Sequence, residues 1–492
     1  MIRKISPVWR VAWLGLVVAT GVFARDEYTR TVDRTVTVHA GERVTIENKF
    51  GDVNVKTHAS PDVVIHADVK ASAGDSDRAK RLAESIEIQI DPSSNGLSIR
   101  TKYPEQENWL GSHNNSYSVR YDITVPETAP LDVHNSFGAV RVTGTKAGGT
   151  IVNSHGELTF RDAAGIQHLT NSFGRVEVGN VAGDVDLESS FGAVDAQDIK
   201  GALEVRNKFG GVNVARASRG VRITNGNGTV DVSDSGGAGE IRNSFGGVTV
   251  RNQRGRLTVN NSNGKIDADS VEGPAELNTT FGSVTFHDVG GNLSVRAGNA
   301  RVDGARVHGD LAVVNSFGPV TAEDVQGAVR VQSNNSAVVV RQVRGDAILK
   351  TSFGMVEATD VGGAVTIDNS NGGVRATGAK GAQITTSFGA VMLDGISGPI
   401  QVQDQNGAVE ASSVAGACQS VVVRTSFSTI RVHLSQANYR VTARTSFGRI
   451  RTDMPVTVNG ITSNDELNGV IGAGACELRL TDNNGAIEIL KR

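Results

Sequence analysis

Few residues in this chain of 492 have the types and spacing that catalysis requires. The string Ser262-Asn263-Gly264-Lys265 matches a Ser-x-x-Lys pattern, in which serine and lysine act together across one helical turn. Its surroundings predict a corner followed by a strand, so the two groups would not share a helical turn. The ten histidines are scattered, and no pair has metal-ligand spacing with a carboxylate nearby. We therefore expect no catalytic, cofactor-binding or metal-ligating residues.

Aspartate recurs at one position of an 18-residue period, which raises the possibility of a calcium-binding β-roll. Such rolls need Gly-Gly-x-Gly-x-Asp at every corner. Here neighbouring periods carry Arg216, Arg306 or Gln342 at that position. Turn-capping aspartates are the favoured interpretation, because aspartate side chains hydrogen-bond the backbone of tight turns. The aspartates at this position are Asp162, Asp198, Asp234, Asp288, Asp324 and Asp360.

The two cysteines, Cys418 and Cys476, stand in matching Gly-Ala-Cys strings. Two cysteines exclude a disulfide-dense scaffold and a cysteine-rich metal site. An oxidising compartment would allow them to pair. Counting periods places them about two coils apart, roughly 10 Å, beyond the usual Cα limit of about 7 Å unless loops bend. Both the bridged and the free form stay open at this level.

Composition and charge narrow the class of protein. The chain has 49 Lys and Arg against 52 Asp and Glu, with a formal net charge of −3, so no nucleic-acid partner is expected. Residues 1–24 are predicted to be a signal peptide, with a basic start and an apolar run from Val11 to Val22 that is short for a membrane span. An uncleaved anchor is the alternative. We expect an exported bacterial protein (periplasmic, outer-surface or secreted) with no membrane span after cleavage.

A repeat organises most of the chain. Taking the Phe of Asn-Ser-Phe-Gly as a marker gives 14 markers, from residue 137 to 371, spaced by an unbroken 18 residues. Aliphatic residues follow at fixed offsets of three, five, twelve and fourteen. Asparagine often stands two residues before the marker. The corner residues singled out are Phe137, Phe173, Phe191, Phe209, Phe245, Phe281, Phe317 and Phe353, with Asn135, Asn171, Asn243 and Asn315.

Each period predicts two short strands and two turns, with alternate residues facing a core. A unit this short cannot bury its apolar face alone, so it must stack on its neighbours. We expect an all-β fold, a parallel β-solenoid with 18-residue coils. The uneven aliphatic spacing favours a right-handed over a left-handed β-helix, and the unbroken period contradicts a row of β-sandwiches. On this pattern Thr249 is expected to face outward.

The marker rings allow two interpretations. They share the parity of inward positions, which favours a place in the core over an exposed aromatic strip that grips sugar rings. From residue 209 the marker alternates between Phe and Asn. We interpret the alternation as a limit on stacking, with a ring too thick to recur on every coil.

The repeat divides the chain. Residues 25–130 are predicted to form a β-rich N-terminal cap with one short helix after Asp75. Residues 131–410 form the regular solenoid, and residues 411–492 form irregular coils that cap the other end. Caps of this kind cover otherwise open sheet edges.

The Gly-x-Val-x-Val units, the Val-Pro strand before them and the closing segments 437–448 and 476–485 resemble the bacterial putative-adhesin family of β-strand-repeat proteins. The resemblance implies an envelope or secreted β-solenoid and supplies no catalytic residues. We therefore expect a non-enzymatic, adhesin-like or scaffolding surface protein. A carbohydrate-active β-helix enzyme, a polysaccharide lyase or hydrolase, is the alternative. The partner stays open between a cell-wall polymer, a glycan and a surface protein.

Overall fold

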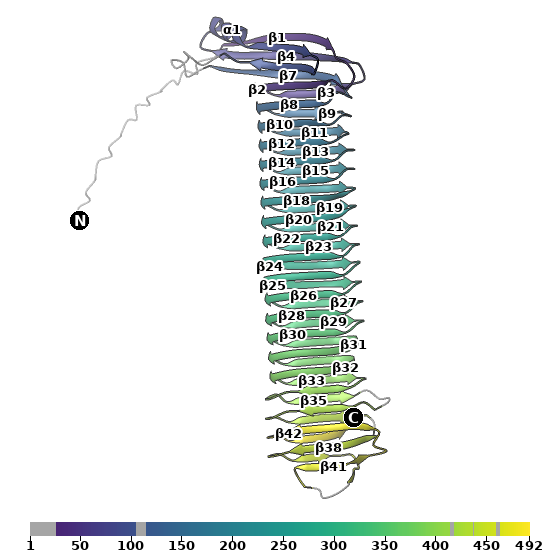
Figure 1. Cartoon of the computed structure of the whole chain (residues 1–492). Coiled ribbons are helices and arrows are strands. Elements are labelled where there is room, and N and C mark those ends of the chain that lie inside the picture. Colours follow the sequence, from purple (N-terminus) through teal and green to yellow (C-terminus); the bar gives the residue numbers. More distant parts are fainter. Residues whose placement is uncertain (1–25, 105–114, 414–417, 436, 459–462) are drawn as a thin grey trace, which may run out of the picture.

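The computed structural model describes residues 26–104, 115–413, 418–435, 437–458 and 463–492. Within these residues the structure is nearly all-β, with 70% strand and one helix, and forms a parallel β-solenoid of about 17 turns with roughly 18-residue spacing. The predicted fold class is confirmed. The coils stack into a long rod with a wider end at the N-terminal side (Figure 1). The signal peptide predicted for residues 1–24 lies outside the described residues.

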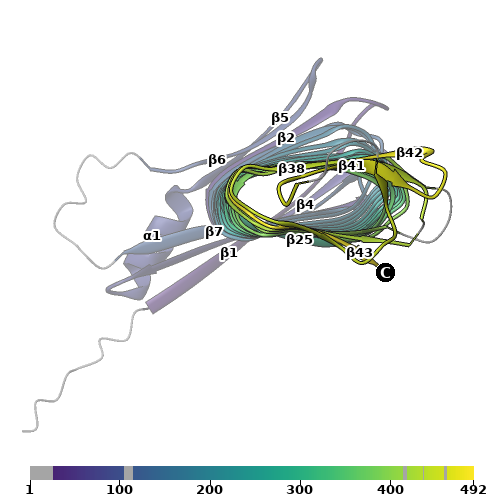
Figure 2. The same ribbon diagram turned by 90° about the horizontal axis from the view of Figure 1, so that it is seen from below.

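Two long sheets face each other across a flattened core, which Figure 2 shows end-on. The first sheet contains the strands that lead up to each marker: β8 (Leu131–Phe137), β10 (Gly149–His155), β12 (Gln167–Phe173), β14 (Val185–Phe191), β16 (Leu203–Phe209), β18 (Gly220–Asn227), β20 (Ala238–Phe245), β22 (Leu257–Asn263), β26 (Leu311–Phe317), β28 (Val329–Asn335), β30 (Ala347–Phe353), β34 (Ile400–Gln403) and β36 (Val421–Arg424).

The second sheet contains the strands that follow the markers. They are β9 (Val140–Thr143), β11 (Leu158–Ala163), β13 (Val176–Val181), β15 (Val194–Ile199), β17 (Val212–Ala217), β19 (Val230–Ser235), β21 (Val248–Gln253), β23 (Ile266–Val271), β27 (Val320–Val325), β29 (Val338–Val343), β33 (Val391–Ile396), β35 (Val409–Ser413) and β37 (Ile430–Leu434). Four longer strands bend through both sheets: β24 (Ala275–Val289), β25 (Leu293–Val307), β31 (Val356–Asn371) and β32 (Val374–Phe388).

The stacking follows the 18-residue period residue by residue. Val176 of β13 pairs with Val194 of β15, and Val194 pairs in turn with Val212 of β17. Most inward positions are therefore occupied by columns of buried aliphatic side chains. Thr249 alternates with the buried Val248 and Val250 and holds the expected outward position, yet it is only 7% exposed. The register places it between Asp231 and Asp267, so its neighbours in the sheet flank it on both sides.

At the N-terminal end, the order in which the strands lie side by side differs from their order in the chain. The elements of this end are β1 (Asp26–Thr37), β2 (Arg43–Phe50), β3 (Val53–His58), β4 (Asp62–Ala73), α1 (Ser76–Ser85), β5 (Glu87–Ser93), β6 (Gly96–Lys102) and β7 (Ser116–Pro126). The coil formed by β2 and β3 lies between β6–β7 and β8–β9, because each of its strands pairs with both neighbours. Beyond it β7, β4 and β1 form an antiparallel sheet. Asp75 caps α1 by accepting a hydrogen bond from the backbone N–H of Arg78 at 2.8 Å.

The C-terminal end reorders strands in the same manner. It contains β38 (Tyr439–Thr445), β39 (Ile450–Thr452), β40 (Thr457–Val458), β41 (Glu466–Ile471), β42 (Cys476–Asp482) and β43 (Ile487–Lys491). The last coil, β42–β43, is inserted between β36–β37 and β38–β39. β41 then runs antiparallel to β38 and covers the end. In this segment the spatial order of coils therefore differs from their order in the chain.

Candidate functional site

The corner at most of the regular markers is held by an inward asparagine. Asn171 donates from Nδ2 to the carbonyl of Gly174 in its own coil at 2.9 Å and to that of Gly156 in the preceding coil at 3.2 Å. Asn225 also donates to the amide oxygen of Asn243 in the next coil at 3.0 Å. These bonds join successive coils through buried side chains, as expected for a stacked amide ladder.

At most markers the next residue is a glycine whose backbone conformation disfavours a side chain. Gly174 has a φ of +117°, which L side chains rarely adopt, and a Cβ there would lie 2.2 Å from the carbonyl oxygen of Gly156. The backbone turns sharply here, between the buried asparagine and the glycine.

The marker phenylalanines lie on the outside of the molecule, so the predicted place in the core is wrong. Their exposed fractions range from 43% at Phe137 to 54% at Phe245, and the group comprises Phe137, Phe173, Phe191, Phe209, Phe245, Phe281, Phe317 and Phe353. The prediction assumes that strand alternation continues through the corner. The bend after the inward asparagine interrupts that alternation, and the ring two residues later faces solvent.

In the first coils the exposed rings stack on every coil. Ring centroids lie 4.6 Å apart between Phe137 and His155, 4.7 Å between His155 and Phe173, and 4.9 Å between Phe173 and Phe191. The column ends with Phe191 on Phe209 at 5.0 Å and an interplanar angle of 3°. A ring is therefore not too thick to recur on each coil, and the alternation after residue 209 needs another explanation.

A groove runs beside the marker corner on the outer face of the first sheet. It holds about 680 Å³ and extends from Thr224 to Val314, across successive strands. Its lining is rich in amides and hydroxyls: Asn278 donates to Asn260 at 3.0 Å, and Arg242 reaches Glu240 at 2.6 Å. Ser244, Ser262 and Thr280 line the side next to the markers.

The same face is hollowed near the N-terminal end. A groove of about 520 Å³ is lined by Lys49, Ser136 and Ser154, each the residue just before a marker position. His134 and Val152 occupy the places that Arg242 and Asn260 hold in the larger groove. The hollow is thus a recurrent feature of the marker corner.

The recurring aspartates lie at a second bend of each coil, after the marker corner, where the backbone has a left-handed conformation. At this position twelve successive coils have a φ of 53–58°, a region that asparagine and aspartate tolerate better than most residues. The side chains pair along the rod, as in the bond from Arg216 Nε to Asp198 at 2.6 Å. This hydrogen bond and the charge of Arg216 lower the pKa of Asp198. Within the described ranges no three His, Cys, Asp or Glu side chains are grouped to hold a metal ion.

Carboxylates also meet in a hollow of about 160 Å³ on the second sheet, which bears on the enzyme alternative. Arg175 reaches Glu177 at 3.3 Å and Asp195 at 3.0 Å, while Arg161 contacts Glu177 at 2.9 Å. Glycoside hydrolysis needs one carboxyl with a raised pKa opposite an ionised one. Arginines pair with the carboxylates here, so the arrangement is an ion-pair network.

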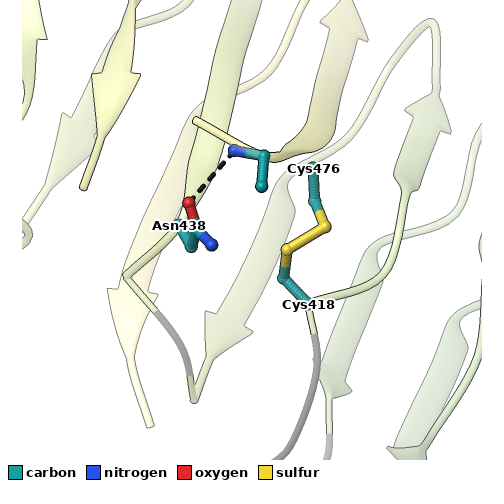
Figure 3. Close-up of a disulfide and its surroundings, with 4 residues drawn as sticks. Cys418, Asn438 and Cys476 are labelled. Carbon is teal, nitrogen blue, oxygen red and sulfur yellow. Dashed lines mark hydrogen bonds between the residues drawn. A yellow bond between two sulfur atoms is a disulfide. The ribbon is translucent and has the colours of Figure 1, made fainter. Parts of the chain in front are cut away.

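Cys418 and Cys476 form a disulfide, shown in Figure 3, with Cα atoms 5.9 Å apart. The expected separation of roughly 10 Å is wrong, because it assumed that coils stack in chain order. The insertion of β42 next to β36 brings Cys476 close to the segment that precedes β36. Beside the bridge, Asn438 accepts a hydrogen bond from the backbone N–H of Ala475 at 3.0 Å.

Comparisons with known proteins give few matches. No family model and no curated protein matches the chain. One similar solved structure is described as a putative cell adhesion protein from Clostridium sporogenes; it is 11% identical, with a TM-score of 0.19, over 44% of this chain and 100% of that one. Another, a putative adhesin from Parabacteroides distasonis, is 12% identical with the same TM-score, over 63% and 96%. No helix among the described residues is long and apolar enough to span a membrane.

Proposed function

We propose that the protein is an exported, non-enzymatic, adhesin-like rod that binds a linear polysaccharide along the groove beside its marker corner. The groove carries the proposal. It follows the rod axis across several coils and presents amides, hydroxyls and arginines, including Asn260, Asn278 and Arg296. Sugar hydroxyls both donate and accept hydrogen bonds, and an extended polymer meets the same kinds of groups on successive coils.

Export is part of the proposal and has two supports. The N-terminal sequence has the composition of a signal peptide. The Cys418–Cys476 disulfide suits an oxidising compartment. A surface location would expose the full length of the groove to polymers outside the cell.

Binding of the purified protein to a panel of polysaccharides tests the proposal. The double variant Arg242→Ala/Asn278→Ala removes two donors from the groove and should weaken binding at least about tenfold. Arg222→Ala is the matched control, because Arg222 contacts the same Glu240, at 3.3 Å, but lies outside the groove. We expect the control to bind like the unaltered protein. Failure to bind any linear polysaccharide, or release of reducing ends from one, would contradict the proposal, and the latter would favour the enzyme.

A further inference from the structure

After residue 209 the exposed rings alternate with asparagines, and stacking within the molecule does not explain this alternation. Within the described part of the chain, the ring contacts along this corner end at Phe209. Beyond it, rings recur at every second coil with asparagine between them. Their exposed fractions stay near one half, and the set comprises Phe209, Phe245, Phe281, Phe317, Phe353 and Phe388. We call these rings the knobs.

Between successive knobs lies a slot above an asparagine. The register places Asn263 between Phe245 and Phe281, one coil from each. The N-terminal column shows what such an interval can hold. There Phe191 fits between Phe173 and Phe209 at centroid distances of 4.9 and 5.0 Å. The interval between two knobs therefore has the height of one further ring, and the shorter asparagine side chain occupies its base.

We propose that a second copy of this chain supplies those rings, so that two rods associate side by side and antiparallel through residues 209–388. The knobs of the two copies have the same period, because they belong to the same sequence. A two-fold axis between the coils of Asn299 and Phe317 places Phe317 of each copy over Asn299 of the other. It likewise places Phe281 over Asn335 and Phe245 over Asn371. Such an isologous contact closes on itself and does not grow into a fibre.

The size and charge of this strip fit an interface. A phenylalanine buries about 150–250 Å² when fully covered, so six half-exposed knobs supply about 600 Å² per copy. Two copies reach about 1,200 Å², the lower limit for a stable interface. In residues 207–390, the positions that directly flank the markers are mostly Gly, Ser, Thr and Ala, with charge only at Lys208, Lys265 and Arg301. Interface cores are depleted of charge in the same way.

Sedimentation velocity of the purified protein over a micromolar to submillimolar concentration series tests the inference. We expect a dimer. Phe281→Asn/Phe317→Asn removes central knobs and should raise the dissociation constant at least about tenfold. A protein that stays monomeric throughout the series would overturn the inference.

A variant with phenylalanine in the slots distinguishes insertion of one copy's knobs between those of the other from unspecific association of apolar surfaces. Asn263→Phe/Asn299→Phe creates a second continuous ring column, from residue 245 to residue 317, of the kind that residues 173–209 already form. The variant should therefore fold, as circular dichroism will show. We expect this variant to be monomeric, because the partner's rings have no slot to enter. If this variant associates as strongly as the unaltered protein, or more strongly, the proposed insertion of knobs into slots is wrong. Sedimentation uses no polysaccharide, so this result is independent of the binding assay on the groove.

Discussion

At the scale of single residues, Asp404 is a buried carboxyl group at a marker corner. It occupies the inward position that asparagine holds in many coils, and it is only 3% exposed. One carboxylate oxygen accepts a hydrogen bond from the backbone N–H of Gly407, and the other has no partner. Burial raises the pKa of Asp404, and backbone hydrogen bonds from Gly407 and its neighbours oppose this shift only in part.

Asp404→Asn should stabilise the protein at neutral pH by about 1 kcal/mol, because the amide removes a buried charge and can donate to a corner carbonyl. The unfolded chain loses the Asp404 proton near its ordinary pKa of about 3.9, whereas the folded chain retains it to higher pH. The unaltered protein therefore loses stability as pH rises through this window. The advantage of the variant should be absent below the window and complete above it. Denaturant unfolding of both proteins across pH measures this difference, and a pH-independent difference would contradict the role given to the charge.

The corner also shows where sequence reasoning succeeds and fails. Strand alternation still holds at Asn135 and Asn171, which belong to strands and face inward. It fails for Phe137 and Phe173, two residues later, because the backbone bends before the glycine and parity no longer applies. The left-handed bend at Asp162 could be inferred only as a turn, since arginine and glutamine occupy it in other coils.

At the scale of the element, strand β26 allows a test of which face is buried. Val313 is 1% exposed and packs between Val295 and Val331. Its neighbour Ala312 is exposed and lies between Ser294 and Arg330. This strand is a better choice than β21, where Thr249 is buried between two aspartates.

Val313→Asp should destabilise the solenoid by several kcal/mol, because it buries a carboxylate with no partner between two valines. Ala312→Asp should change the unfolding free energy by less than about 0.5 kcal/mol. Thermal unfolding followed by circular dichroism compares the two variants. Equal losses of stability would show that the two faces of β26 are not distinguished by burial.

At the scale of the whole molecule, the period predicts the regular coils but not the order in which the last ones stack. β38 and β42 both present aliphatic side chains at alternate positions, so either could follow β36. The structure places β42 there, and the Cys418–Cys476 bridge spans the same junction. Periodicity records which face of a strand is apolar, whereas turn lengths and single contacts decide which strand is its neighbour.

The regular coils should be removable in pairs, because each contacts only its neighbours. Deleting residues 245–280 joins Ser244 to Phe281 and preserves both the corner and the alternation of Phe and Asn. Val230 would then stack on Val284 in place of Val248, one aliphatic residue for another. We expect a folded rod about 10 Å shorter, as measured by small-angle scattering.

Deleting residues 245–271 is the control, because it removes one and a half coils. It would connect Ser244, at the end of a first-sheet strand, to the turn at Glu272 and omit the second-sheet strand that belongs between them. Two strands of the same sheet would then follow each other, and the coil could not close around its core. This protein should aggregate or be degraded, whereas equal folding of both deletion variants would contradict the modular stacking of 18-residue coils.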